Sequence, residues 1–185
     1  MTTEHPAILA SIQRPGGDIT LRYATAADHP LLLAFGRSLP REDLMFLRRD
    51  ITQPEEIDAW IEDIRRGLNG TILAVRNGEV LGYASVSRAP LAWVRHVAEL
   101  RVVVSPTARG EGIGRALTEA AFRIGTDMNV LKLVAQMTLD QAAAMAVFKR
   151  LGFASEALLP DQVIDAEGGT HDLVVMSRRL DPSAD

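Results

Sequence analysis

The six residues Arg109-Gly110-Glu111-Gly112-Ile113-Gly114 join an apolar run, Val102-Val103-Val104, to a long helical pattern that begins at Arg115. Glycines between a strand and a helix let the backbone come close to a ligand and direct free N–H groups toward it. The positive end of the helix dipole also favours an anion at this position. The stretch therefore predicts a loop that binds a phosphate-bearing ligand.

The spacing of the glycines excludes two common nucleotide-binding loops. A dinucleotide fingerprint requires glycine at its sixth position, and counting from Gly110 that position is Arg115. A nucleoside-triphosphate loop requires Gly-Lys followed by Ser or Thr, a string that the sequence lacks. The pattern that remains is Arg-x-x-Gly-x-Gly at Arg109, Gly112 and Gly114. The alternative interpretation is a glycine-rich turn that only reverses the chain.

Composition predicts a single domain. The chain has 185 residues and a hydrophobic content of 47%, which is enough for one substantial core. No apolar run approaches the length of a membrane span, and the first six residues lack the features of a secretory signal. We therefore expect a cytoplasmic protein without a membrane partner.

Net charge, histidine spacing and cysteine content limit the partners, metal sites and reaction routes that the sequence allows. The formal net charge of −4 argues against nucleic acid as the main partner and is compatible with a cationic amine. The four histidines are far apart and form no metal-ligand spacing, so no metal site is predicted. Without cysteine the chain cannot form a cysteinyl acyl-enzyme, so direct transfer is the simpler route for acyl chemistry.

The first third of the chain predicts a tail, a strand and two helices. Residues 1–18 show little periodicity and are expected to be a flexible N-terminal tail, followed by a strand over residues 19–23. Asp28 resembles the N-cap of a first helix, and Thr52 with Glu55 resembles a capping box that opens a second. The second helix is expected to end near Gly67 or Gly70.

The remaining elements alternate between strands and helices. Asn77-Gly78, between two strand-like runs, is a strong hairpin signal because both positions accept positive φ. The strand before the glycine loop and the strand after the next helix are expected to be parallel. The expected strands cover residues 71–76, 79–87, 93–104, 131–137, 158–164 and 172–176, and the expected helices begin at Gly114 and cover residues 140–151.

This order of elements, the Arg-x-x-Gly-x-Gly loop and Leu151-Gly152-Phe153 together resemble the GCN5-related N-acetyltransferases, the GNAT superfamily. The resemblance covers residues 19–180 as one domain and leaves residues 181–185 as a C-terminal tail. It implies an α/β (α+β) fold with a mixed central sheet of about six to seven strands flanked by about four helices.

The resemblance also implies acetyl-CoA as co-substrate and no metal. The strand before the loop would offer backbone groups to the pantetheine arm, and the loop and the start of the next helix would bind the pyrophosphate. For Arg109 and Arg115 a solvated surface role is an equal alternative. The cofactor-binding residues implied are Leu100, Val102, Val104, Arg109, Gly110, Glu111, Gly112, Ile113, Gly114, Arg115, Gln141 and Phe148.

One family motif departs from its usual form. Members commonly carry an asparagine ten residues before the leucine of Leu-Gly-Phe and a tyrosine three residues before it, where this chain has Gln141 and Phe148. The tyrosine is commonly assigned as the acid that protonates the departing CoA thiolate, and phenylalanine has no proton to give. We expect Phe148 to be a packing residue, so the thiolate would take its proton from water or another side chain, or leave as the anion.

Glu99 is the candidate general base, because only the unprotonated amine can attack a thioester. Its Ala-Glu-Leu context resembles members of the family that carry a glutamate there to remove the proton, directly or through water. The alternative is a solvent-facing residue paired with Arg101, two positions along on the same face. The resemblance assigns oxyanion stabilisation to backbone N–H groups of the same strand.

The acceptor is left open between an amine-bearing small molecule and a protein lysine. Segments 38–49 and 89–96 are expected to recognise it, and the strand around Glu99 is weakly similar to bacterial Pat-type protein-lysine acetyltransferases. The function expected is direct, base-assisted acetyl transfer in a ternary complex. The alternative is a catalytically weak acetyl-CoA-binding regulatory domain, and the resemblance allows a homodimer.

Overall fold

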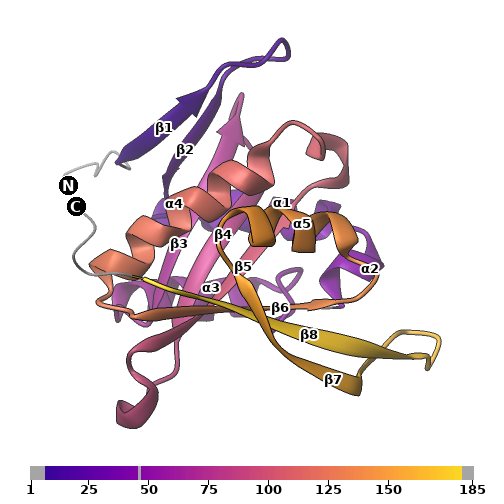
Figure 1. Ribbon diagram of the computed structural model, residues 1–185. Coiled ribbons are helices and arrows are strands. Elements are labelled where there is room, and N and C mark those ends of the chain that lie inside the picture. Colours follow the sequence, from indigo (N-terminus) through magenta and orange to yellow (C-terminus); the bar gives the residue numbers. More distant parts are fainter. Residues whose placement is uncertain (1–6, 46, 181–185) are drawn as a thin grey trace.

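The computed structural model describes residues 7–45 and 47–180. Within them the chain forms one open sheet of eight strands in the spatial order β1-β2-β3-β4-β5-β6-β8-β7 (Figure 1). The strands are β1 (Ile8–Ile12), β2 (Ile19–Tyr23), β3 (Asn69–Arg76), β4 (Glu79–Arg88), β5 (Val97–Val104), β6 (Lys132–Thr138), β7 (Ala154–Ile164) and β8 (Thr170–Arg179).

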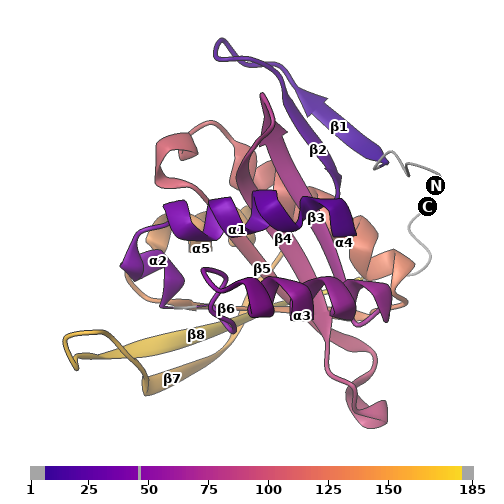
Figure 2. The same cartoon turned by 180° about the vertical axis from the view of Figure 1, so that it is seen from behind.

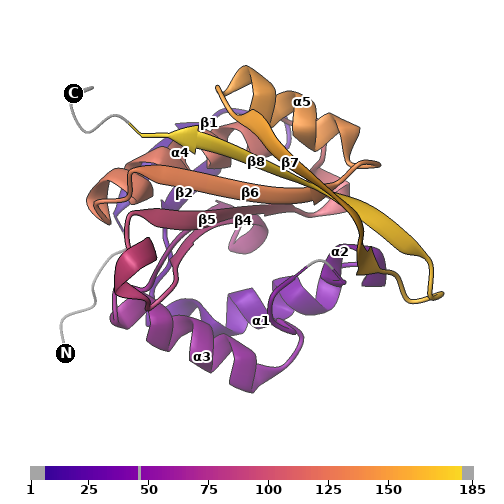
Figure 3. The same ribbon diagram turned by 60° about the horizontal axis from the view of Figure 1, so that its bottom comes forward.

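Helices cover both faces of the sheet. Figure 3 shows α1 and α3 on one face and α4 and α5 on the other, and Figure 2 shows α1 and α3 from their own side. Each face therefore has its own hydrophobic core. The α-helices are α1 (His29–Ser38), α2 (Arg41–Leu44), α3 (Pro54–Arg65), α4 (Ile113–Asp127) and α5 (Ala142–Arg150), and short 3-10 helices cover Ala26–Asp28, Ala92–Val94 and Pro106–Ala108.

Neighbouring strands are antiparallel except for β5 and β6, which run parallel and are joined through α4 as expected. The predicted strand over residues 19–23 is confirmed as β2. Asn77 and Gly78 both have positive φ, 52° and 80°, which confirms the predicted hairpin turn between β3 and β4. No helix in the described ranges is both long and apolar enough to cross a membrane.

One of the two expected helix caps is confirmed in position, and the other was wrong. The N-cap of α3 is Gln53, and the Thr52 hydroxyl donates to Asp50 at 2.6 Å, so Thr52 and Glu55 form no capping box. Asp28 is the N-cap residue of α1, as expected, but its carboxylate accepts hydrogen bonds from the backbone N–H of Thr25 at 2.8 Å and from Arg22 at 2.6 Å and none from the helix. Short polar side chains such as those of Thr52 and Asp28 bond equally well to neighbours outside the helix, so the sequence does not fix the capping hydrogen bond.

Two segments differ from the sequence expectation. β5 begins at Val97 and not at residue 93, because residues 92–94 form a 3-10 turn in which Trp93 is 76% exposed. Residues 8–12, expected to lie in a tail, form β1, which pairs antiparallel with β2 and includes an irregularity in register. Its mostly exposed side chains explain why no hydrophobic periodicity marks this strand.

Candidate active site

Strands β5 and β6 separate partway along their length, and the opening that this leaves in the sheet is called the fork. The two strands pair only at Val97 with Lys132, Ala98 with Leu133 and Glu99 with Val134. Beyond this point β6 continues beside β8, and β5 continues beside β4 to Val104. From Leu100 onward the β6-facing edge of β5 has no strand partner, so its backbone N–H and C=O groups can bind an extended ligand.

The predicted pantetheine residues lie along this free edge. The Leu100 side chain is buried against the core that α4 covers, and Val102 and Val104 pack against the same core. Only their backbone groups are therefore left to face a ligand in the fork. Thr138, the last residue of β6, holds a buried hydroxyl without a hydrogen-bond partner among the described atoms.

The glycine loop opens directly into α4. Gly112 is the N-cap of the helix with φ of 80°, Gly110 has φ of 84°, and no side chain caps the helix. The N–H groups of the first turn are therefore left for a ligand. Ile113 is buried and anchors the helix start, and a Cβ at Gly110 would meet no atom within 4 Å. This arrangement fits an anion such as a diphosphate.

The charged residues of the loop and first turn have protein partners. Arg109 donates to the Asp43 carboxylate of α2 at 2.6 Å and to the Val104 carbonyl at 3.3 Å. Arg115 pairs with Glu119 on the exposed surface of α4 at 2.8 Å. Arg109 thus lies beside the end of β5, whereas the position of Arg115 agrees with the alternative surface role.

Helix α5 lies beside α4 on the same face of the sheet (Figure 1). Gln141 is its N-cap residue, and its side chain makes no capping hydrogen bond. Phe148 is buried, and its ring meets Phe153 edge-on with centroids 4.8 Å apart. The expected packing role of Phe148 is therefore observed.

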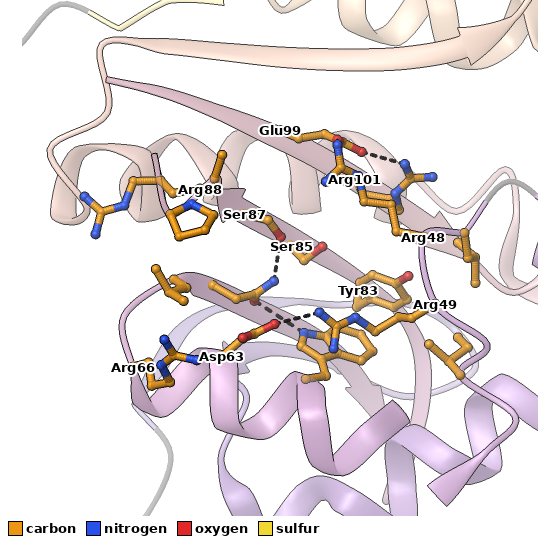
Figure 4. A pocket seen from close by; sticks show the side chains of 17 residues that line it. Arg48, Arg49, Asp63, Arg66, Tyr83, Ser85, Ser87, Arg88, Glu99 and Arg101 are labelled. Atoms are coloured by element: carbon orange, nitrogen blue, oxygen red, sulfur yellow. Dashed lines mark hydrogen bonds and ion pairs between the residues drawn. The ribbon is translucent and has the colours of Figure 1, made fainter. Parts of the chain in front are cut away.

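A cavity of about 400 Å³ lies on the other face of the sheet, between β4, β5 and the segment that precedes α3 (Figure 4). Glu99 and Arg101 of β5 lie directly opposite Ser87 and Ser85 of β4. Tyr83 is buried at the cavity wall, and this burial raises the pKa of its hydroxyl. The cavity is therefore lined by polar groups around one carboxylate at the fork.

Glu99 is held by two guanidinium groups. Arg101 donates to Oε1 at 2.5 Å, and Arg48, from the segment after α2, pairs with Oε2. The Glu99 side chain is only 11% exposed, whereas that of Arg48 is 66% exposed. The structure thus places Glu99 in the cavity and also shows the pairing with Arg101 that the alternative interpretation expected.

The cavity has an excess of positive charge. Five arginines line it, against two carboxylates, Glu99 and Asp63. Asp63 pairs with Arg49 at 2.6 Å. Arg88 donates to the backbone carbonyls of Met128 and Gly67, and within the described ranges no carboxylate pairs with Arg66 or Arg88. An anionic group on a ligand would therefore be favoured here.

Comparison with known proteins agrees with this geometry. The family model described as the Acetyltransferase (GNAT) family matches residues 37–153, which include α2, α3, the fork, the glycine loop and α5. The chain belongs to the GNAT acetyltransferase family. Its reaction class is acetyl-CoA-dependent N-acetylation.

Relatives of this GNAT domain span almost its whole length. The L-methionine sulfoximine/L-methionine sulfone acetyltransferase of Pseudomonas aeruginosa is 29% identical over 89% of this chain and 96% of the relative. The structure of ribosomal-protein-alanine N-acetyltransferase from Brucella melitensis matches with 31% identity and a TM-score of 0.76, covering 86% of this chain and 99% of that one. The Salmonella typhimurium protein yncA, a putative acetyltransferase solved with its cofactor acetyl-CoA, matches with 25% identity and a TM-score of 0.77, covering 90% and 96%.

Four of the five arginines that line the cavity of this acetyltransferase could not be recognised from its sequence. Arg48 and Arg49 fall in segment 38–49, which was expected to recognise the acceptor, but no spacing marked them individually. Arg66 and Arg88 come from the end of α3 and the end of β4, and only the fold brings them together. In the part of the chain that the structure describes, no group of three or more His, Asp or Glu side chains could hold a metal ion.

Proposed function

We propose that this enzyme acetylates the amine of a small acceptor that also carries an anionic group, as an amino acid does. The observation that carries the proposal is the position of Glu99. It lies at the last paired residue of the fork, inside a cavity whose other charged groups are mostly arginines. A carboxylate for the ammonium and guanidinium groups for the anion thus occur in one cavity.

Glu99 acts as the base, directly or through one water molecule. An acceptor ammonium must lose a proton before its nitrogen can attack, and a carboxylate within hydrogen-bond reach accepts it. Both Glu99 oxygens are paired in the structure, so one partner must give way. Arg48 is the partner that moves, because its side chain is mostly exposed while that of Arg101 is mostly buried.

In this proposal the acyl donor binds on the side of the fork opposite the cavity. Backbone groups of β5 from Leu100 to Val104 would hold the pantetheine arm, and the N–H groups at Gly112–Gly114 would hold the diphosphate. Acetyl-CoA supplies the acetyl group as a thioester. Phe148 has no proton to donate at the position where relatives commonly carry tyrosine, so the thiol group leaves as its anion or is protonated by water.

The charge of the cavity distinguishes an amino acid from a protein lysine. A free amino acid brings its own carboxylate into the cavity together with the amine, and the excess positive charge of the cavity would stabilise it. A lysine side chain on a protein brings no such group. The Pseudomonas aeruginosa relative, named for L-methionine sulfoximine and L-methionine sulfone, supports the same chemical class.

The experiment compares acceptors that differ only in this charge. Release of CoA is measured with L-methionine sulfone, with its carboxamide, and with peptides that begin with alanine or contain lysine. We expect the free acid to be acetylated with the highest kcat/KM. Preference for the carboxamide or the lysine peptide would contradict the proposed acceptor, and saturable binding of acetyl-CoA without turnover of any amine would favour the regulatory alternative.

Arg66→Gln removes one positive charge from the cavity and leaves a shorter, neutral polar side chain. We expect kcat/KM for the free acid to fall by about tenfold and that for the carboxamide to stay within about twofold, because a charged hydrogen bond contributes about 1.5–3 kcal/mol when partly buried. Arg65→Gln is the matched control, since the neighbouring Arg65 pairs with Glu62 and does not line the cavity. An equal loss for both acceptors would contradict recognition of the anion by Arg66.

A further inference from the structure

The turn between β1 and β2 reaches the glycine loop. Arg14 lies in this turn, which is closed by the hydrogen bond from the Gly17 N–H to the Arg14 carbonyl at 3.0 Å. The hairpin projects past the same end of the sheet at which the glycine loop lies (Figure 1). A segment 97 residues away in sequence is thus brought to the cofactor loop.

Arg14 binds the main chain of the loop. Its Nε and Nη2 donate to the Glu111 carbonyl oxygen at 3.0 and 2.8 Å. A Cβ added at Gly112 would lie 3.3 Å from Nη2, so the guanidinium packs directly against this peptide. The bond between residues 111 and 112 is trans, so the Gly112 N–H points away from the carbonyl that Arg14 holds. Arg14 therefore fixes the direction in which this N–H is presented.

Arg76, at the end of β3, binds the side chain of the same residue. Its Nη1 and Nη2 meet the two carboxylate oxygens of Glu111 at 2.8 and 3.4 Å. Both side chains are mostly buried, with 19% and 27% exposed. A free carboxylate at this position would repel a diphosphate at the helix start, and the pairing with Arg76 neutralises it.

We propose that Arg14 and Arg76 are positioning residues for the diphosphate of acetyl-CoA, acting through Glu111. Arg14 orients the 111–112 peptide so that its N–H faces the ligand, and Arg76 neutralises the Glu111 carboxylate. Neither residue needs to touch the cofactor. The N-terminal hairpin is then part of the acyl-donor site, and the proposal holds whichever amine accepts the acetyl group.

Arg14→Ala tests the first role with two acyl donors. Acetyl-CoA carries the diphosphate, and acetyl-pantetheine lacks it. We expect Arg14→Ala to raise KM for acetyl-CoA about tenfold with kcat nearly unchanged, and to leave kcat/KM for acetyl-pantetheine within about twofold. Arg14→Lys, which keeps one cationic donor, should recover part of the loss. Arg65→Ala is the control, because Arg65 is an exposed arginine far from the loop in sequence.

The neutralising role of Arg76 is tested by removing Arg76 and then also removing the charge of Glu111. Arg76→Ala leaves the Glu111 carboxylate without its partner, so the Kd for CoA, measured by calorimetry, should rise about tenfold. Adding Glu111→Gln to this variant should restore most of the affinity, because the repulsive charge is gone. Calorimetry of CoA binding needs no turnover, so a failure of this proposal is distinguishable from a failure of the proposed acceptor.

Two results would overturn the proposal. The first is an equal loss with acetyl-CoA and acetyl-pantetheine in Arg14→Ala, which would indicate a general structural role for the hairpin. The second is an Arg76→Ala affinity that Glu111→Gln fails to improve. Melting temperatures of all variants are recorded alongside, so that a variant that does not fold is identified, and Arg14→Lys and Arg76→Lys then replace the alanine variants.

Discussion

Glu99→Gln should lower kcat by about 100-fold or more while the Kd for CoA stays nearly the same. Glutamine keeps the size of the side chain but cannot accept the proton of an acceptor ammonium. The substitution lies on the cavity face of β5, while the cofactor is expected to bind along its free edge and at the glycine loop. Steady-state release of CoA and calorimetry with CoA measure the two quantities separately.

The pH dependence of the activity distinguishes the loss of a general base from the loss of a binding contact. If Glu99 removes the proton, the variant can use only the amine that is already neutral, and this fraction rises tenfold per pH unit below the amine pKa. The activity of Glu99→Gln should therefore recover steadily as pH increases toward that pKa. Ser87→Ala, at the cross-strand position opposite Glu99, is the control for the loss of a polar group that lines the cavity but is not the proposed base. Unchanged turnover in Glu99→Gln would remove Glu99 from the mechanism.

Gly112→Asp should abolish measurable binding of CoA. The residue is the N-cap of α4 at φ of 80°, so the substitution strains the backbone and adds a negative charge at the helix start, whose N–H groups are expected to bind the diphosphate. The added Cβ would also lie 3.3 Å from Arg14 Nη2 and disturb the contact between Arg14 and the loop. We expect the Kd, measured by calorimetry, to rise by at least about 100-fold, corresponding to about 2.7 kcal/mol or more. The loss should extend to acetyl-CoA turnover at any accessible concentration.

Two variants control for the backbone conformation at this glycine. Gly112→Ala adds strain at positive φ without charge and should weaken binding far less. Gly168→Asp places the same side chain at a glycine with φ of 87° in the turn between β7 and β8, where a Cβ meets no atom within 4 Å. CoA affinity that survives Gly112→Asp, or falls equally in Gly168→Asp, would argue against a diphosphate at the start of α4.

The fold was predicted best where the hydrophobic periodicity and the turn-forming residues indicate the same element. α4 and its glycine loop, β2 and the hairpin at Asn77-Gly78 all combine a clear hydrophobic period with glycine or asparagine at the required positions. β1 could not be predicted, because its side chains are mostly exposed and its stability comes from pairing with β2. Trp93 suggested an early start for β5, but the aromatic side chain lies exposed on a turn.

The site was predictable only in part, for a similar reason. The glycine loop is a local motif, so its residues could be named from sequence, and Glu99 followed from the resemblance. Arg48, Arg66 and Arg14 come from separate segments, and only the folded chain shows that the first two line the cavity and the third binds the loop. Arginine is common on protein surfaces, so a single position in sequence does not reveal such a role.

A structure of the protein crystallised with CoA tests the central claim most directly. The N–H groups of Gly112, Ile113 and Gly114 at the start of α4 are expected to lie within hydrogen-bond distance of the diphosphate oxygens, with the pantetheine arm along the free edge of β5. A diphosphate bound elsewhere on the molecule, with these N–H groups facing only water, would contradict it.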